Sequence, residues 1–302
     1  MHGFWSELRH TLRALRRNPG FTTVAGLTLA LGLGATTAIF AVLDSVVLDP
    51  LPYPGSERIV RVDHPVPGYD PDAAWDLSVA GYFHLRDENR TLASLGAYMV
   101  TEVTVTDEGR GARRVDGGAV TASLLETLRA RPLHGRLFGP AEDGPDARAV
   151  AVLGHDYWVR AYGGDPGAVG TTVEIDGDPF EIVGVMAPRS ELPDRSVDVW
   201  VPLTIDPAAP PVNAHFLSAV GRLAPDASIA EARRDFDRLT ARFTELFPGA
   251  YQPSFMDRYG FRTRVTPLRD HVIGDVAGVL WTLLGAVGLV LLIACANVAN
   301  LF

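Results

Sequence analysis

The sequence contains no lysine and only one cysteine, so all 27 basic side chains of the 302-residue chain are arginines. Without lysine there is no P-loop GxxxxGK[ST] motif, no lysine Schiff base and no Ser-Lys dyad. Cys295 alone cannot form an intrachain disulfide, a CxxC redox pair or a thiolate zinc site. These absences exclude P-loop ATP hydrolysis, lysine-dependent catalysis and dithiol chemistry from this chain.

Recognisable catalytic and metal-binding patterns are missing as well. The eight histidines are scattered without an HExxH or HxH spacing, and no GxSxG elbow is present. We expect these histidines, and the loop acids Asp70, Asp72 and Asp76, at the solvated surface. A net charge of -9 disfavours phosphate contacts with nucleic acid. The sequence therefore predicts no catalytic residue, no metal ligand and no cofactor, in a protein that is neither an enzyme nor a nucleic-acid binder.

Charged residues are absent from two long apolar stretches, which run from Phe21 to Val42 and from Val276 to Phe302. A helix needs about 20 apolar residues to cross a bilayer, and each stretch meets this length. A cleaved signal peptide is the alternative for the first stretch. That stretch exceeds the usual 7–15 or so apolar residues of a signal peptide, however, and no A-x-A site follows it. We therefore predict transmembrane helices at residues 21–47 and 273–302.

Arginine is concentrated in the segment that precedes the first apolar stretch. This segment contains one acid and four arginines, namely Arg9, Arg13, Arg16 and Arg17. The positive-inside rule then places the N-terminus in the cytoplasm and residues 48–272 outside it. Apolar residues recur at helical spacing among these arginines. This pattern predicts an amphipathic helix over residues 1–20 that lies on the inner leaflet of the lipid bilayer.

Both predicted spans carry small residues at every fourth position. The first stripe consists of Gly26, Ala30, Gly34 and Ala38, and the second includes Gly278, Thr282 and Ala286. Residues four apart lie along one face of a helix, and small side chains let helix backbones approach closely. We therefore predict that these stripes are helix-packing surfaces and that the two spans pack on each other through them.

The region between the spans alternates strand and helix patterns. It predicts an α/β subdomain from residues 53–140 and 212–268, with a β-rich insertion at residues 148–206. Long helices are expected over residues 78–95 and 228–247, the second with a capping box of Ser228 and Glu231. Asp176-Gly177-Asp178 between two apolar runs predicts a β-hairpin.

Several stretches carry a family resemblance and occur in the family's order over nearly the whole chain. They are Leu12–Ile39, Pro50–Pro54, Phe138–Asp143, Val150–Trp158, Gly163–Gly170, Phe180–Pro188, Val199–Leu203, Val265–Asp270 and Leu291–Leu301. In these stretches the chain resembles the permease of a type VII ABC transporter. The group is MacB/FtsX-like, and the similarity is to its acidobacterial-type duplicated permease branch.

The resemblance implies an α+β membrane protein of the inner (cytoplasmic) membrane, multi-pass, with a cytoplasmic N-terminus and a periplasmic MacB-like core domain over residues 48–272. It implies a permease subunit that couples ATP hydrolysis by a separate ABC ATPase subunit to motion of the periplasmic domain, for efflux or mechanotransmission. A second permease copy, as a homodimer or a duplicated half, is the other expected protein partner.

Family members continue beyond the last matching stretch, whereas this sequence stops at Phe302, so we expect a truncation after the second span. Two other functions stay open from the sequence. A membrane-tethered periplasmic binding module without ATPase coupling would show the same spans. A tethered periplasmic enzyme is disfavoured because no catalytic constellation is visible.

Overall fold

The computed structural model describes residues 19–43, 51–107, 109, 111–189, 192, 197–274 and 276–299. The chain divides into two compact units. The first comprises residues 1–50 and 273–302 and is called the helix unit below. The second, residues 51–272, is called the core domain. The predicted amphipathic helix lies almost wholly outside the described residues.

The helix unit contains two long apolar helices, α2 (Pro19–Leu43) and α10 (Val276–Ala299). Proline is tolerated at the start of a helix because its missing N–H would have no intrahelical partner there. No proline follows in either helix, and neither contains a charged side chain. Two helices near the ends of the chain thus flank an α+β domain.

The core domain contains twelve strands among its described residues. They are β1 (Ile59–Pro65), β2 (Ala74–Trp75), β3 (Leu77–Ser78), β4 (Leu92–Asp107), β5 (Gly111–Val120), β6 (Pro132–Gly135), β7 (Val150–Leu153), β8 (Thr172–Ile175), β9 (Asp178–Met186), β10 (Val199–Pro202), β11 (His215–Leu223) and β12 (Arg264–Pro267). The α-helices are α3 (Val79–Glu88), α4 (Ala122–Leu128), α5 (His155–Tyr162), α6 (Ile229–Ala241), α7 (Phe243–Leu246), α8 (Pro253–Tyr259) and α9 (Leu268–Ile273). Short 3₁₀ turns are η2 (Ser56–Arg58), η3 (Pro140–Glu142) and η4 (Pro166–Ala168).

All twelve strands belong to one hydrogen-bonded sheet. Its main path is β12-β1-β11-β4-β5-β10-β7-β9-β6, with β2 paired to β1, β3 to β11, and β8 to both β4 and β9. Two pairs on this path are parallel, β10 with β5 and β7 with β9, and the others are antiparallel. The sheet runs continuously through both predicted blocks, residues 53–140 with 212–268 and residues 148–206. That division remains a prediction.

Strand β4 is the element that connects the parts of this sheet. Its 16 residues span about 50 Å at the usual rise of a strand. Its first half pairs with β11, its second half with β5, and its end with β8. It contributes Leu95, Tyr98 and Val105 to three different buried clusters. A single strand therefore ties the three apolar cores of the domain together.

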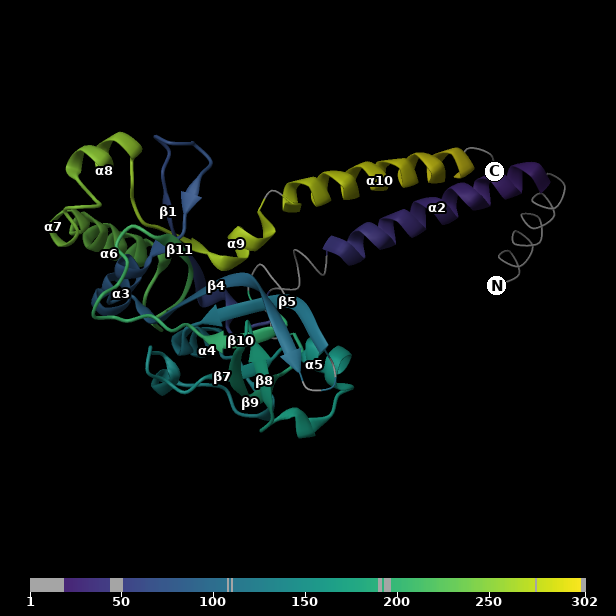
Figure 1. Ribbon diagram of the computed structural model, residues 1–302. Coiled ribbons are helices and arrows are strands. Elements are labelled where there is room, and N and C mark those ends of the chain that lie inside the picture. The colour runs from purple at the N-terminus through teal and green to yellow at the C-terminus, as the bar shows by residue number, and fades with distance from the viewer. Residues whose placement is uncertain are drawn as a thin grey trace. The chain divides into compact units, whose positions relative to one another are not determined.

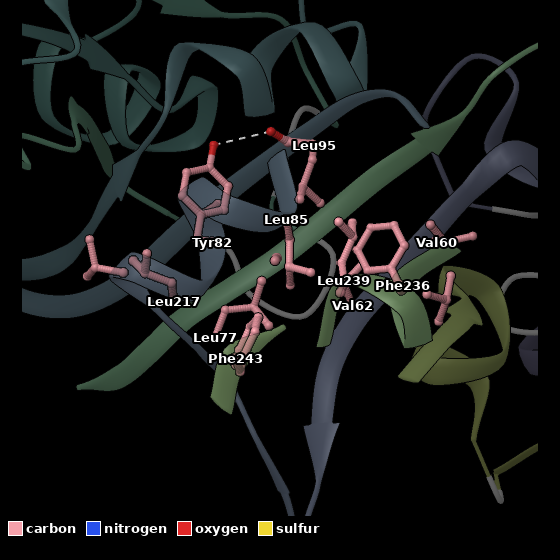
Figure 2. Close-up of a cluster of buried hydrophobic side chains, with 14 of the residues drawn as sticks. Val60, Val62, Leu77, Tyr82, Leu85, Leu95, Leu217, Phe236, Leu239 and Phe243 are labelled. Carbon is pink, nitrogen blue, oxygen red and sulfur yellow. Dashed lines mark hydrogen bonds between the residues drawn. The ribbon is translucent and has the colours of Figure 1, made fainter. Parts of the chain in front are cut away.

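The largest apolar core lies between the sheet and helices α3 and α6 (Figure 2). Helix α6 contributes Phe236 and Leu239, both fully buried. Burying each such side chain contributes about 2 kcal/mol. The predicted capping box is confirmed, since the Ser228 hydroxyl accepts from the Glu231 N–H and the Glu231 carboxylate accepts from the Ser228 N–H.

Two predicted helices have different lengths in the structure. The helix expected over residues 78–95 ends at Glu88, because Asn89 is extended and its side-chain amide donates to the Leu85 carbonyl at 2.8 Å. The chain then enters β4. The helix expected over residues 228–247 is divided at Arg242 into α6 and α7. Helix α8 and strand β6 are additional elements that the sequence pattern did not predict.

Candidate functional site

The helix unit is the first candidate site, because α2 and α10 lie side by side and run in opposite directions (Figure 1). Both are long and apolar enough to cross a membrane, over Gly26–Leu43 and Gly278–Ala296, and most of their described side chains are exposed. The hydroxyls of Thr28 and Thr282 donate at 2.8 Å to carbonyl oxygens four residues earlier. Such internal hydrogen bonds satisfy polar groups where lipid offers no partner. By length and composition, the pair suits a bilayer.

The predicted small-residue stripes do not form the contact between these helices. An ideal Cβ added at Gly26, Gly34 or Gly278 meets no atom within 4 Å. The close approach is at Gly32, where an added Cβ would lie 2.9 Å from Cδ1 of Leu291. Two residues along a helix correspond to a turn of about 200°, so Gly32 and Gly34 point to opposite sides. The prediction that the spans pack through these stripes is therefore wrong.

The remaining members of the stripes are also exposed. They are Ala30, Ala38, Thr282 and Ala286. Their packing against helices from outside this chain stays a prediction. The four arginines that determine the predicted orientation, Arg9, Arg13, Arg16 and Arg17, lie outside the described residues.

The core domain contains a second candidate site, an open groove between α3 and α4 that we call the α3–α4 groove. It comprises adjoining cavities of about 750 Å³ and 260 Å³ that share Arg86, Pro140 and Asp143 in their walls. Helix α3 supplies Tyr82 and Arg86, and the guanidinium of Arg86 lies 4.8 Å from the ring centre of Phe83. The groove therefore combines aromatic surface with positive charge, because Arg129 and Arg131 line its larger cavity as well.

Asp143 is one of two acids that line the α3–α4 groove, with Glu126, and it belongs to one of the stretches that carry the family resemblance. Its carboxylate oxygens accept the N–H of Ala122 at 2.9 and 3.0 Å, at the beginning of α4. Burial raises the pKa of Asp143 to about 6, and the Ala122 hydrogen bond acts against that increase. The groove thus contains a carboxylate that titrates just below neutral pH.

A buried histidine lies on β1, next to the loop that precedes β12. His64 has no exposed surface, and its ring centre is 4.5 Å from that of Phe261. Its Nδ1 lies 3.3 Å from the Arg262 carbonyl oxygen, and Nε2 is buried without a partner in the part of the chain that the structure describes. Burial, and then the charge of His215, lowers the pKa of His64 to about 3. The expectation that the histidines lie at the surface is wrong for His64.

These two pKa shifts act on stability in opposite directions. The unfolded chain protonates His64 near pH 6.5, whereas the folded domain keeps the ring neutral down to about pH 3. The contribution of the neutral His64 ring to the free energy of unfolding is therefore fully present above pH 6.5. It is lost as the pH falls from 6.5 toward about 3. The half-buried carboxylate of Asp143 destabilises the fold above about pH 6, and protonation relieves that cost toward pH 3.8.

The described residues of the α3–α4 groove do not place a nucleophile beside a base. The Ser123 hydroxyl lies 3.1 Å from that of Tyr82 and 2.9 Å from that of Thr121. In the described ranges, no group of three His, Cys, Asp or Glu side chains could hold a metal ion. The groove can bind and orient a ligand through Arg86, Asp143 and its aromatic wall.

The chain belongs to the MacB-like periplasmic core domain family, whose sequence profile matches residues 22–239. This is the periplasmic domain of MacB/FtsX-type ABC transporter permeases, a domain family that is typically non-catalytic. The curated proteins include no significant match to this sequence.

Two solved structures have a similar fold. A domain of a protein described as a permease from Porphyromonas gingivalis has a TM-score of 0.52 at 15% identity, over 71% of this chain and 92% of that chain. The periplasmic region of MacB from Actinobacillus actinomycetemcomitans has a TM-score of 0.51 at 13% identity, over 73% of this chain and 93% of that chain. At these identities, the likeness concerns the fold.

Proposed function

We propose that the chain is a permease subunit of a MacB/FtsX-type ABC transporter. In this role it couples ATP hydrolysis by a separate ABC ATPase subunit to motion of its core domain in the periplasm. The observation that carries the proposal is the insertion of a MacB-like core domain between two exposed apolar helices that pack on each other. Homologues in this family are ABC transporter permease domains, so an ATPase partner is expected in general.

The strand pairing supports a mechanical role for this arrangement. The first long strand after α2 is β1, and the last strand before α10 is β12. They are antiparallel neighbours, with Val62 opposite Val265. The chain therefore leads from both apolar helices to neighbouring strands at one end of the sheet, and β11 and the long strand β4 continue from there into the rest of the domain.

An ion pair between an exposed arginine and a buried carboxylate joins the same two strands. Arg264 on β12 donates from Nε and Nη2 to the two carboxylate oxygens of Asp63 on β1, at 2.9 and 2.8 Å, and Asp63 is only 3% exposed. A bidentate Arg–carboxylate pair fixes the relative position of its partners more rigidly than a single contact does. We propose that this pair helps the two strands to move as one body.

ATP-dependent motion of the core domain tests the proposal. Cys295→Ser removes the native thiol, and Asp178→Cys places a spin label at the β8–β9 hairpin. We would measure distances between the labels of two copies in nanodiscs that also contain the copurifying ABC ATPase. The proposal predicts a distance distribution that changes on ATP addition. Arg264→Gln should reduce that change more than it reduces ATP hydrolysis.

The alternative is a membrane-tethered periplasmic binding module without ATPase coupling. That function predicts that no ABC ATPase copurifies and that the label distances stay the same with and without ATP. This result would overturn the permease proposal and leave membrane attachment intact.

A further inference from the structure

Three arginines converge around Gly55 at the beginning of the core domain. We call Arg58, Arg129 and Arg222 the arginine cluster. Gly55 has a positive φ of 68° and no side chain. An ideal Cβ at this position would lie 3.0 Å from Nη1 of Arg222 and 3.8 Å from Nη1 of Arg129. Two guanidinium groups thus border the space that a side chain would occupy at Gly55.

Arg222 is buried without an acidic partner. It is 4% exposed, its Nε donates to the Thr127 carbonyl at 2.9 Å, and its Nη1 donates to the Gly55 carbonyl at 2.8 Å. Its Nη2 is buried and has no partner in the described part of the chain. The other two buried charged residues in that part, Arg61 and Asp63, each form an ion pair. Arg222 is therefore the exception.

The rest of the arginine cluster does not neutralise this charge. Arg58 donates from Nη2 to the Leu223 carbonyl, and its Nε is buried without a partner among the described residues. Burial, and then repulsion from Arg129 and Arg58, lowers the pKa of Arg222. Glu57 is the one acid that acts on Arg222, and its Oε1 lies 3.7 Å from the same Cβ position. Two arginines and one acid thus act on Arg222, and a buried charge such as that of Arg222 requires compensation.

A mainly apolar cavity adjoins the arginine cluster, shares Arg129 with it and is also lined by Arg189. This cavity of about 40 Å³ is lined mainly by Pro52, Tyr53, Leu128, Met186 and Trp200. The indole Nε1 of Trp200 is buried without a partner among the residues that the structure describes. An anion bound by the cluster would therefore have apolar surface beside it.

The arginine cluster lies near the ends of the core domain that continue into the apolar helices. Gly55 follows the last residue of α2, Leu43, by twelve positions. Leu268, which begins α9 and is followed by α10, is buried in the same cluster as Tyr53 and Leu128. Both connections to the apolar helices therefore start from this part of the domain.

We propose that the arginine cluster binds a phosphate group, supplied either by the headgroup of an anionic phospholipid or by free phosphate. Guanidinium groups match phosphate oxygens in geometry as well as in charge, and such charge-assisted hydrogen bonds are among the strongest in proteins. The phosphate would accept from Arg129, which lines the cavity, while the buried guanidinium groups of Arg58 and Arg222 would add positive charge close by. The lipid source rests on the proposed membrane location, whereas phosphate binding does not.

The test compares two exposed arginines two positions apart in the full chain, solubilised in a non-ionic detergent. Arg129→Gln removes one member of the cluster, and Arg131→Gln is the control with the same change of charge. Native mass spectrometry and thermal shift would follow binding of inorganic phosphate and of dihexanoyl phosphatidylglycerol. Dihexanoylglycerol serves as the phosphate-free lipid. Arg222→Gln is a second, more severe variant, because it also removes the hydrogen bonds from Arg222 to the carbonyls of Thr127 and Gly55.

We expect Arg129→Gln to weaken binding of the phosphate-bearing probes about tenfold, as the loss of one charge-assisted hydrogen bond implies. Arg131→Gln should change the affinity for these probes less than twofold, and dihexanoylglycerol should not bind at the arginine cluster. Tighter binding of the phosphatidylglycerol indicates a headgroup, and tighter binding of inorganic phosphate indicates the free ion. Equal affinities of the two variants, or no binding of either phosphate probe at millimolar concentration, would overturn the proposal. Neither result bears on ATP-dependent motion.

Discussion

The contact between α4 and β4 gives a stringent test of core packing, because it depends on the absence of a side chain at Gly96. An ideal Cβ there would lie 2.2 Å from Cα of Leu124 and 2.5 Å from its backbone nitrogen, whereas ordinary contacts are 3.4–4 Å. The backbone of α4 cannot rotate away as a side chain would. The Gly96→Ala variant must therefore shift the helix by more than an ångström.

The expected loss of stability follows from this overlap. Overpacking a core typically costs about 1–3 kcal/mol, and a backbone contact belongs at the upper end of that range. Replacing glycine with alanine also restricts the unfolded chain, and this stabilises the folded state by about 0.5–1 kcal/mol. We therefore expect Gly96→Ala to lower the free energy of unfolding by about 2 kcal/mol, or the Tm by about 4–8 °C for a domain of this size.

Thermal unfolding of the full chain in detergent, followed by tryptophan fluorescence, measures this loss. Gly249→Ala is the matched control, because a Cβ at Gly249 meets no atom within 4 Å. Its Tm should equal or slightly exceed that of the wild type. A Gly96→Ala variant that melts within about 1 °C of this control would refute the close packing of α4 on β4.

Two further predictions concern the apolar helices and the buried histidine. Gly32→Leu should reduce cysteine crosslinking between α2 and α10, because an added Cβ already lies 2.9 Å from Leu291, whereas Gly34→Leu should not. Equal crosslinking in the two variants would contradict the contact at Gly32. As the pH falls below 6.5, His64 should destabilise the core domain by about 1.4 kcal/mol per pH unit, partly offset by Asp143. Urea titrations between pH 7 and 4.5 should show a shallower loss for His64→Phe. An unchanged pH slope would show that His64 titrates normally.

Local signals in the sequence predict much of this fold. The turn at Asp176 and Gly177 is confirmed, and both residues have positive φ, as a tight hairpin between twisted strands requires. The capping box at Ser228 also lies where the sequence places it. In each case the side chains that determine the structure are within a few residues of one another.

The parts that the sequence pattern missed depend on distant residues. Helix α3 ends at Glu88 and the chain enters β4 at Leu92, a strand that requires β11 and β5 as partners. Arg222 meets Gly55 across 167 positions, so the arginine cluster has no local motif. The one local signal at Arg222 is an arginine that directly follows the uncharged run Phe216–Gly221 within the same strand. Small residues occur on both sides of α2, at Gly32 as well as at Gly34, so their spacing alone does not indicate which side meets α10.

The central claim is that α2 and α10 cross the membrane and that the core domain between them lies outside the cytoplasm. The most direct measurement uses the Cys295→Ser background with a single new cysteine, at Asp178 in the core domain or at Ser6 before α2. In intact cells with a permeable outer membrane, a membrane-impermeant maleimide should label Asp178→Cys and should label Ser6→Cys only after lysis. Labelling of Ser6→Cys in intact cells, with Asp178→Cys protected until lysis, would contradict the account.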